Sequence, residues 1–298
     1  MRNASALSRW VAPMIAAGIL LGGCGQTPPT RTAASGAPAV KGFSGQTAPE
    51  AAAAAGEPLA AGSRGNGKHP QAADPGSMPA GTIYRNPASG RNEVVVEDVA
   101  RTAVLIGDSQ SEPAFSWPRE ALANLGYTVH FCGRGGTGFV ASNGKTGNYV
   151  DALHRGDWLL PYGSPPLVVI EGGGNDASRG ATDEAISANA ERLIASVRQR
   201  YPTARLAMVG TLARGADNGG GRRTEVDALL GTVAARQSVP FVGVGDWLTR
   251  YNLTTSMADG VHMSPEGHAA LGVLLARRLD ALGLRAPGSA PAESAATR

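Results

Sequence analysis

Residues 102–109 read Thr-Ala-Val-Leu-Ile-Gly-Asp-Ser, and this stretch decides the fold. Its first part is short and nearly continuously apolar, which is typical of a strand that is buried on both faces of a parallel sheet. Runs of the same kind recur along the chain at 127–132, 167–171, 205–210 and 241–244. The sequence therefore predicts five buried strands.

Amphipathic segments alternate with these runs, and their apolar spacing predicts helices at 118–125, 183–200, 222–236 and 265–282. The last of them has a clear start, because Ser264 can cap it and Pro265 suits the first helical position. Strand and helix units in alternation imply right-handed crossovers. We expect an α/β fold, a three-layer α/β/α sandwich around a mostly parallel five-stranded sheet.

Before this region the chain begins like an exported protein. Arg2 and Arg9 precede an apolar run at 10–21, which is too short for a stable membrane-spanning helix. The run ends in Leu-Gly-Gly followed by Cys24, which resembles the lipobox of bacterial lipoproteins. This resemblance implies that Cys24 is acylated and anchors the protein to the membrane of the cell envelope. An ordinary cleaved signal peptide and a secreted protein are the alternative.

Amino-acid composition indicates which parts of the remaining chain fold and which do not. Residues 24–80 are rich in Ala, Gly and Pro and carry few large apolar side chains, which is typical of a disordered tether. Residues 286–298 have the same composition and are expected to be a disordered tail. We therefore expect a signal peptide at 1–23, a tether at 24–80, one folded domain at 81–285 and the tail.

Charge and cysteine content exclude several classes of partner. The formal net charge is only +3, and two of the basic residues lie in the expected signal peptide, so no nucleic acid partner is indicated. The chain has 2 cysteines, too few for a disulfide scaffold or a four-cysteine zinc site. No cluster of histidine and cysteine suggests a metal, and we expect no cofactor. The sequence leaves the oligomeric state open.

Polar segments stand where the strands are expected to end. Asp108 and Ser109 follow the first strand, a glycine-rich segment at 133–138 follows the second, and Asn175 with Asp176 follows the third. In open parallel sheets, ligands bind beyond the carboxyl ends of the strands. A serine hydroxyl needs a base to remove its proton and a carboxylate to orient that base. The segment Asp-Gly-Val-His at 259–262, just before the last helix, can supply both.

These segments, in this order, resemble the four blocks of the SGNH (GDSL) hydrolase family over about residues 102–282. The resemblance implies a flavodoxin-like fold with a Ser109, His262 and Asp259 triad. It also implies an oxyanion hole formed by Ser109, a glycine of the second block and Asn175. The family's usual asparagine before those glycines is missing, and Phe131 stands in its place. Gly136 is the first choice for the oxyanion glycine and Gly135 the second.

Other patterns have alternative interpretations. The glycines at 133–138 also fit the dinucleotide fingerprint, with Asp151 near the position of its ribose-binding acid. That fingerprint should open a helix at once, whereas 139–145 is typical of a loop. Cys132 and the histidines outside the triad are expected to be structural or solvated; the latter are His69, His130, His154 and His268. Asp108 and Asp176 are expected to brace the turns that carry Ser109 and Asn175, without a role in proton transfer.

Function is expected to be hydrolysis of short-chain esters, with an acetylated envelope carbohydrate as the candidate substrate. The apolar segments are used by the sheet and its helices, so no long apolar lid remains for a fatty acyl chain. An O-acyltransferase using the same triad and a non-catalytic surface-binding lipoprotein are the alternatives. Arginines in the strand-end loops would suit an anionic carbohydrate, and solvated loop arginines are the alternative interpretation; they are Arg134, Arg179, Arg214, Arg222 and Arg223.

Overall fold

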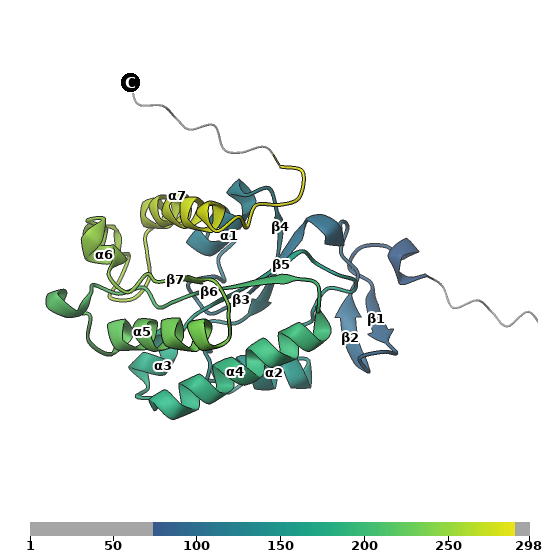
Figure 1. Ribbon diagram of the computed structural model, residues 1–298, viewed down its shortest axis with the longest axis horizontal. Helices are drawn as coiled ribbons and strands as arrows, with labels where there is room; N and C mark the ends of the chain where they lie inside the picture. Colours follow the sequence, from purple (N-terminus) through teal and green to yellow (C-terminus); the bar gives the residue numbers. More distant parts are fainter. Residues whose placement is uncertain (1–73, 290–298) are drawn as a thin grey trace, which may run out of the picture. The chain divides into compact units, whose positions relative to one another are not determined.

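The computed structural model describes residues 74–289 (Figure 1). The expected signal peptide, Cys24, most of the expected tether and residues 290–298 lie outside these described residues. Among residues 74–289, no helix combines the length and the apolar character needed to cross a membrane.

A five-stranded sheet forms the centre of the fold, and every neighbouring pair in it is parallel. The strand order is β4-β3-β5-β6-β7, the order of flavodoxin-like folds. The strands are β3 (Thr102–Gly107), β4 (Thr128–Gly133), β5 (Leu167–Glu171), β6 (Arg205–Val209) and β7 (Phe241–Val242). The five strands predicted from the sequence are thus confirmed. β7 ends two residues early because the Val244 N–H turns away to the carboxylate of Asp227, at 3.0 Å.

Helices cover both faces of the sheet (Figure 1). One face carries α1 (Trp117–Asn124), α6 (Trp247–Arg250) and α7 (Pro265–Ala281), and the other carries α2 (Tyr149–Arg155), α3 (Gly174–Ser178), α4 (Asp183–Arg200) and α5 (Gly221–Arg236). The Gly267 N–H donates to Ser264 Oγ at 3.2 Å, so the predicted cap of α7 is confirmed. The three-layer α/β/α sandwich is confirmed as well.

Successive side chains along each strand point to opposite faces of the sheet, so the strands contribute to two separate hydrophobic cores. Val104 and Ile170 face the α4 and α5 side, whereas Leu105 and Val169 face the α1 and α7 side, and all four are fully buried. Because helices cover both faces, most side chains on either face of the strands are apolar. This explains why the strands read as continuous apolar runs.

The sequence analysis missed a β-hairpin and several short elements. The hairpin pairs β1 (Ile83–Asn86) with β2 (Arg91–Val94) in antiparallel register. Its strands contain mostly polar residues, so no apolar run marks them. Four 3-10 turns complete the described elements, at Pro75–Ser77, Val99–Arg101, Ala216–Asn218 and Thr254–Ser256.

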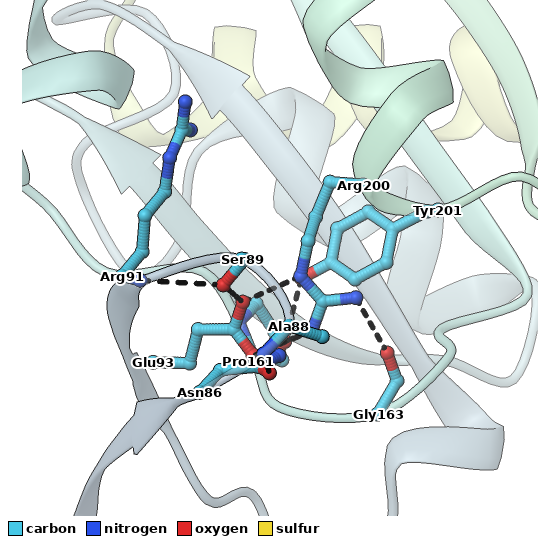
Figure 2. Close-up of polar contacts among 9 residues, drawn as sticks. All are labelled: Asn86, Ala88, Ser89, Arg91, Glu93, Pro161, Gly163, Arg200 and Tyr201. Atoms are coloured by element: carbon cyan, nitrogen blue, oxygen red, sulfur yellow. Dashed lines mark hydrogen bonds and ion pairs between the residues drawn. The ribbon is translucent and has the colours of Figure 1, made fainter.

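A buried ion pair attaches this hairpin to the sandwich (Figure 2). Glu93 on β2 accepts bonds from Nε and Nη2 of Arg200 on α4, at 2.5 and 2.6 Å. Asn86 and Ser89 donate to the same carboxylate at 2.9 and 3.1 Å. The side chains of Glu93 and Arg200 are only 1% and 14% exposed, so each charge depends on the other.

Replacing Glu93 with alanine is therefore expected to lower the free energy of unfolding by about 3 to 5 kcal/mol, because the Arg200 charge is left without its partner. Denaturant unfolding measures the change, with the exposed Glu97→Ala as the matched control. Equal effects of the two variants would show that the ion pair does not stabilise the fold.

The carboxyl-terminal boundary differs slightly from the expected one. The sequence analysis places residue 286 in the tail, whereas Ala286 is 3% exposed in the structure. Its N–H donates to the carbonyl oxygen of Leu125 at 3.0 Å, and its methyl group packs into the core on the α1 and α7 side. The packed region therefore includes this residue.

Candidate active site

Ser109 stands directly after β3, at the carboxyl edge of the sheet. The turn that presents it is held by Asp108, whose Oδ1 accepts the Gln110 N–H at 2.9 Å. The Ser111 N–H closes the same turn by donating to the carbonyl oxygen of Asp108 at 3.0 Å. Asp108 was predicted to brace this turn, and the contact confirms it.

The structure brings the three predicted triad residues together. Ser109 Oγ lies 3.0 Å from His262 Nε2, although the two residues are 153 positions apart in the sequence. His262 Nδ1 lies 2.9 Å from Asp259 Oδ2. The segment that carries the imidazole is anchored beside Ser109, because Gln110 Nε2 donates to the carbonyl oxygen of Val261 at 2.8 Å.

Asp259 is held as an ionised carboxylate. The bond from the His262 ring, followed by backbone bonds from His262 and Val261, keeps the pKa of Asp259 well below its usual value. The two N–H groups reach Oδ1 at 2.7 and 2.6 Å. An ionised carboxylate can only accept hydrogen bonds, so Nδ1 of His262 carries a proton. Nε2 is then free to accept the hydroxyl proton of Ser109.

The two candidate glycines for an oxyanion hole differ in what their N–H groups do. The Gly135 N–H donates to Glu112 Oε2 at 2.8 Å. Within residues 74–289, by contrast, the N–H groups of Gly136 and Ser109 have no protein acceptor. The geometry therefore favours Gly136 over Gly135 as a donor to a ligand. Glu112 was missed in the sequence, where only its position three residues after Ser109 could have drawn attention to it.

Asn175 lines the same cavity as Ser109, but its side-chain amide already donates hydrogen bonds to protein acceptors. It is the second residue of α3, and the turn before this helix is allowed by Gly172 and Gly173, which adopt φ of 150° and 105°. Its amide Nδ2 donates to Asp108 Oδ2 at 3.0 Å and to the carbonyl oxygen of Thr137 at 2.9 Å. Both amide hydrogens are thus in use, so Asn175 must release one bond before it can donate to a substrate oxygen.

Asp176 does not brace the Asn175 turn, contrary to the sequence interpretation. Its carboxylate instead accepts the N–H groups of Phe139, Val140 and Ala141 at 2.9, 2.7 and 2.8 Å. These bonds hold an extended loop after the glycine-rich segment. The next helix, α2, begins only at Tyr149, so the helix that a dinucleotide fingerprint requires is missing at this place.

Two buried carboxyl groups lie beneath the site, and the sequence analysis assigned a role to only one of them. Burial raises the pKa of Asp108 to about 6 and raises the pKa of Glu171 well above its usual value. Ser111 Oγ donates to Glu171 Oε2 at 2.7 Å. The positive charge of Arg223 acts on both carboxyl groups and lowers both pKa values. A glutamate at the end of an otherwise apolar strand was the signal for Glu171.

Two adjoining cavities open at this edge of the sheet. The smaller, of about 10 Å³, is lined by Ser109 and Asn175 among others. The larger, of about 210 Å³, contains Gly260 in its lining. The two cavities share three lining residues, Leu212, Arg223 and Val261.

The other titratable residues singled out in the sequence have structural contacts. His268 Nδ1 accepts the Trp117 N–H at 3.2 Å, in a buried position. His130 Nε2 lies 2.8 Å from the carbonyl oxygen of Leu159, and His154 Nε2 lies 3.0 Å from Ser196 Oγ. Cys132 is buried, and burial raises the pKa of its thiol. His69 lies outside the described residues.

Comparison with solved structures finds several esterase chains of low sequence identity. A family two carbohydrate esterase from Clostridium thermocellum is 19% identical, with a TM-score of 0.49, over 65% of this chain and 68% of its own. The family two carbohydrate esterase from Cellvibrio japonicus is 16% identical, with a TM-score of 0.48, over 61% of each chain. The aryl esterase of M. smegmatis is 19% identical, with a TM-score of 0.44, over 61% of this chain and 99% of its own.

A search of curated proteins finds no match to the chain. Comparison with models of protein families, by contrast, assigns the chain to a family. The model of the GDSL-like Lipase/Acylhydrolase family matches residues 105–270, which is more than half of the sequence and includes the segments of Ser109, Asn175 and His262. The protein therefore belongs to the GDSL-like Lipase/Acylhydrolase family and is a carboxylic ester hydrolase.

Proposed function

We propose that this protein hydrolyses short-chain esters, acetyl esters above all, on a carbohydrate, with Ser109 as the nucleophile. His262 acts as the general base and Asp259 orients it. The observation that carries the proposal is the continuous contact from Ser109 Oγ to His262 Nε2 at 3.0 Å and from Nδ1 to Asp259 at 2.9 Å. This is the arrangement that nucleophilic acyl transfer requires.

In the acylation step, His262 Nε2 takes the hydroxyl proton as Ser109 Oγ attacks the ester carbonyl carbon. The negative charge that develops on the carbonyl oxygen is held by the N–H groups of Ser109 and Gly136. The intermediate collapses when the bond to the alcohol oxygen breaks and Nε2–H gives its proton to that oxygen. Water then attacks the acyl-enzyme with the same base, releases the carboxylic acid and restores the Ser109 hydroxyl.

Asn175 is the third donor in this proposal. A carbonyl oxygen that becomes negatively charged is a stronger acceptor than the neutral carbonyl oxygen of Thr137, so the Asn175 N–H that bonds to Thr137 can donate its hydrogen bond to the substrate oxygen instead. The second bond, to Asp108, keeps the amide in position. Removing one donor of this kind typically lowers the rate by about 100- to 1000-fold.

The size of the cavities supports a small acyl group and a larger polar alcohol. The space beside Ser109, of about 10 Å³, is close to the minimum of about 10–15 Å³ that holds one water molecule. A methyl group is of similar size, whereas a long acyl chain would have no buried place there. The adjoining cavity of about 210 Å³ is lined by two arginines, three glycines and five apolar residues, which suits a sugar with its many hydroxyl groups and its apolar ring faces.

Comparing acyl lengths tests this proposal. We expect kcat/KM for 4-nitrophenyl acetate to exceed that for 4-nitrophenyl octanoate by at least about tenfold, which corresponds to about 1.4 kcal/mol of transition-state stabilisation. Both substrates release the same chromophore, so one spectrophotometric assay serves both. Faster cleavage of the octanoate would contradict the short-chain proposal.

Location is a separate proposal that rests on the sequence around Cys24. We propose that Cys24 is acylated and anchors the protein in the cell envelope. Cys24→Ala is expected to move the protein from the membrane fraction to the soluble fraction without changing its kcat. Fractionation followed by immunoblotting measures this, and Cys132→Ala, at a buried cysteine, is the matched control that stays with the membrane. Unchanged membrane association of Cys24→Ala would contradict the anchor.

A further inference from the structure

Five arginines were expected near the site, and the structure separates them into two groups. Three have acceptors of their own: Arg134 pairs with Glu112 at 3.2 Å, Arg179 donates to the carbonyl oxygens of Gly136 and Ser142, and Arg222 pairs with Asp183 and Glu225. Arg214 and Arg223 form no ion pair with any carboxylate in residues 74–289. Neither charge is fixed to one carboxylate in an ion pair, although that of Arg223 also acts on the buried carboxyl groups of Asp108 and Glu171.

Both of these arginines line the cavity of about 210 Å³. No aspartate or glutamate is among the residues that line it. Arg223 also lines the small cavity that contains Ser109, so it stands at the junction of the two spaces. Its only side-chain hydrogen bond in the described part of the chain is a long one, 3.4 Å, to Ser178 Oγ.

The larger cavity lies on the side from which the alcohol leaves. The leaving oxygen must take its proton from His262 Nε2, so the alcohol part lies next to the segment that carries this imidazole. Gly260 and Val261, the two residues before His262, line the larger cavity, whereas the oxyanion candidates Gly136 and Asn175 do not. The cavity is therefore placed to receive the alcohol part of the ester.

We propose that this cavity is an anion subsite, in which Arg214 and Arg223 bind a carboxylate or phosphate group on the alcohol part of the substrate. The inference rests on the proposed function and narrows its substrate to an acylated anionic carbohydrate. Guanidinium groups match the geometry of both oxyanions through paired N–H donors. Arg223 also lowers the raised pKa values of the buried Asp108 and Glu171 carboxyl groups, so its replacement would disturb the residues beneath Ser109. Arg214 is exposed and gives the cleaner test.

The experiment compares monoacetyl esters of methyl glucuronide, methyl glucoside 6-phosphate and methyl glucoside, using the full chain. For the wild type we expect kcat/KM to be about three- to tenfold higher for the two anionic esters than for the neutral methyl glucoside ester. This is the size of effect that a partly exposed ion pair gives. In Arg214→Ala this ratio is expected to fall towards one, mainly through KM. Arg85→Ala is the matched control, because it removes an equal charge from β1 that forms no ion pair within residues 74–289, and it should keep the wild-type ratio.

Binding of unacetylated methyl glucuronide and methyl glucoside, measured by calorimetry, makes the test independent of catalysis. Weaker binding of the glucuronide by Arg214→Ala than by wild type and Arg85→Ala supports the subsite, even if no ester is cleaved. Cleavage failure would then count against the proposed function alone. The anion-subsite proposal would be overturned if wild type, Arg214→Ala and Arg85→Ala bound methyl glucuronide equally well. It would also be overturned if all three proteins showed the same preference for the anionic esters. Either result would leave the proposed esterase activity intact.

Discussion

Ser109→Ala is expected to lower kcat for 4-nitrophenyl acetate by roughly 10⁴- to 10⁶-fold, the range seen when a triad nucleophile is removed. The variant lacks the oxygen that we propose attacks the ester, while the N–H groups of residue 109 and Gly136 remain. Residual turnover should come only from binding and oxyanion stabilisation. The Tm should stay close to that of the wild type, because the hydroxyl contacts only His262 among the described residues.

Ser142→Ala is the matched control for this variant. Ser142 is exposed on the loop after the glycine-rich segment, and only its backbone carbonyl oxygen accepts a bond, from Arg179. It should keep wild-type kcat. If Ser109→Ala retained turnover within tenfold of the wild type, the assignment of the nucleophile would be wrong.

His262→Ala is expected to lower kcat to a similar extent, roughly 10⁴- to 10⁶-fold. Without the imidazole, nothing removes the Ser109 proton at neutral pH. No other basic side chain in residues 74–289 is hydrogen-bonded to Ser109 Oγ. Steady-state kinetics with 4-nitrophenyl acetate measures the loss, and circular dichroism checks that the fold is retained.

His268→Ala separates the base from a neighbouring histidine in the sequence. His268 is buried, and its Nδ1 accepts the Trp117 N–H. Its removal leaves a buried donor unpaired, which should lower the free energy of unfolding by about 1 to 3 kcal/mol but leave most of kcat for the folded protein. The opposite pattern, loss of turnover in His268→Ala and its retention in His262→Ala, would exchange the two roles.

Sequence patterns predicted the sheet because the apolar character of a buried strand shows in the residues of that strand alone. A strand covered on both faces is apolar along most of its length, so 102–106 and 167–171, which are apolar apart from Thr102 and Glu171 at their ends, could be read directly. The hairpin β1–β2 could not, because its polar residues are stabilised by a side chain more than a hundred positions away, Arg200 on α4. Short helices such as α3 and α6 contain too few turns to show a period.

Some residues of the candidate site could likewise be predicted from the sequence, whereas their tertiary contacts could not. Ser109, Asp259 and His262 stand at strand or helix boundaries, and these positions together with the resemblance to the SGNH (GDSL) family indicated that they meet at one edge of the sheet. The state of the oxyanion donors depends on tertiary contacts instead. Only the folded chain brings Glu112 to the N–H of Gly135, and Asp108 to the amide of Asn175.

The central claim is that Ser109 is the nucleophile activated by His262, and covalent labelling tests it most directly. A fluorophosphonate releases fluoride when an activated serine oxygen attacks its phosphorus, which leaves a stable adduct on that oxygen. Peptide mass spectrometry after brief exposure should find one adduct, on Ser109, absent from Ser109→Ala and formed far more slowly in His262→Ala. An adduct on another serine, or none on the active wild-type protein, would contradict the account.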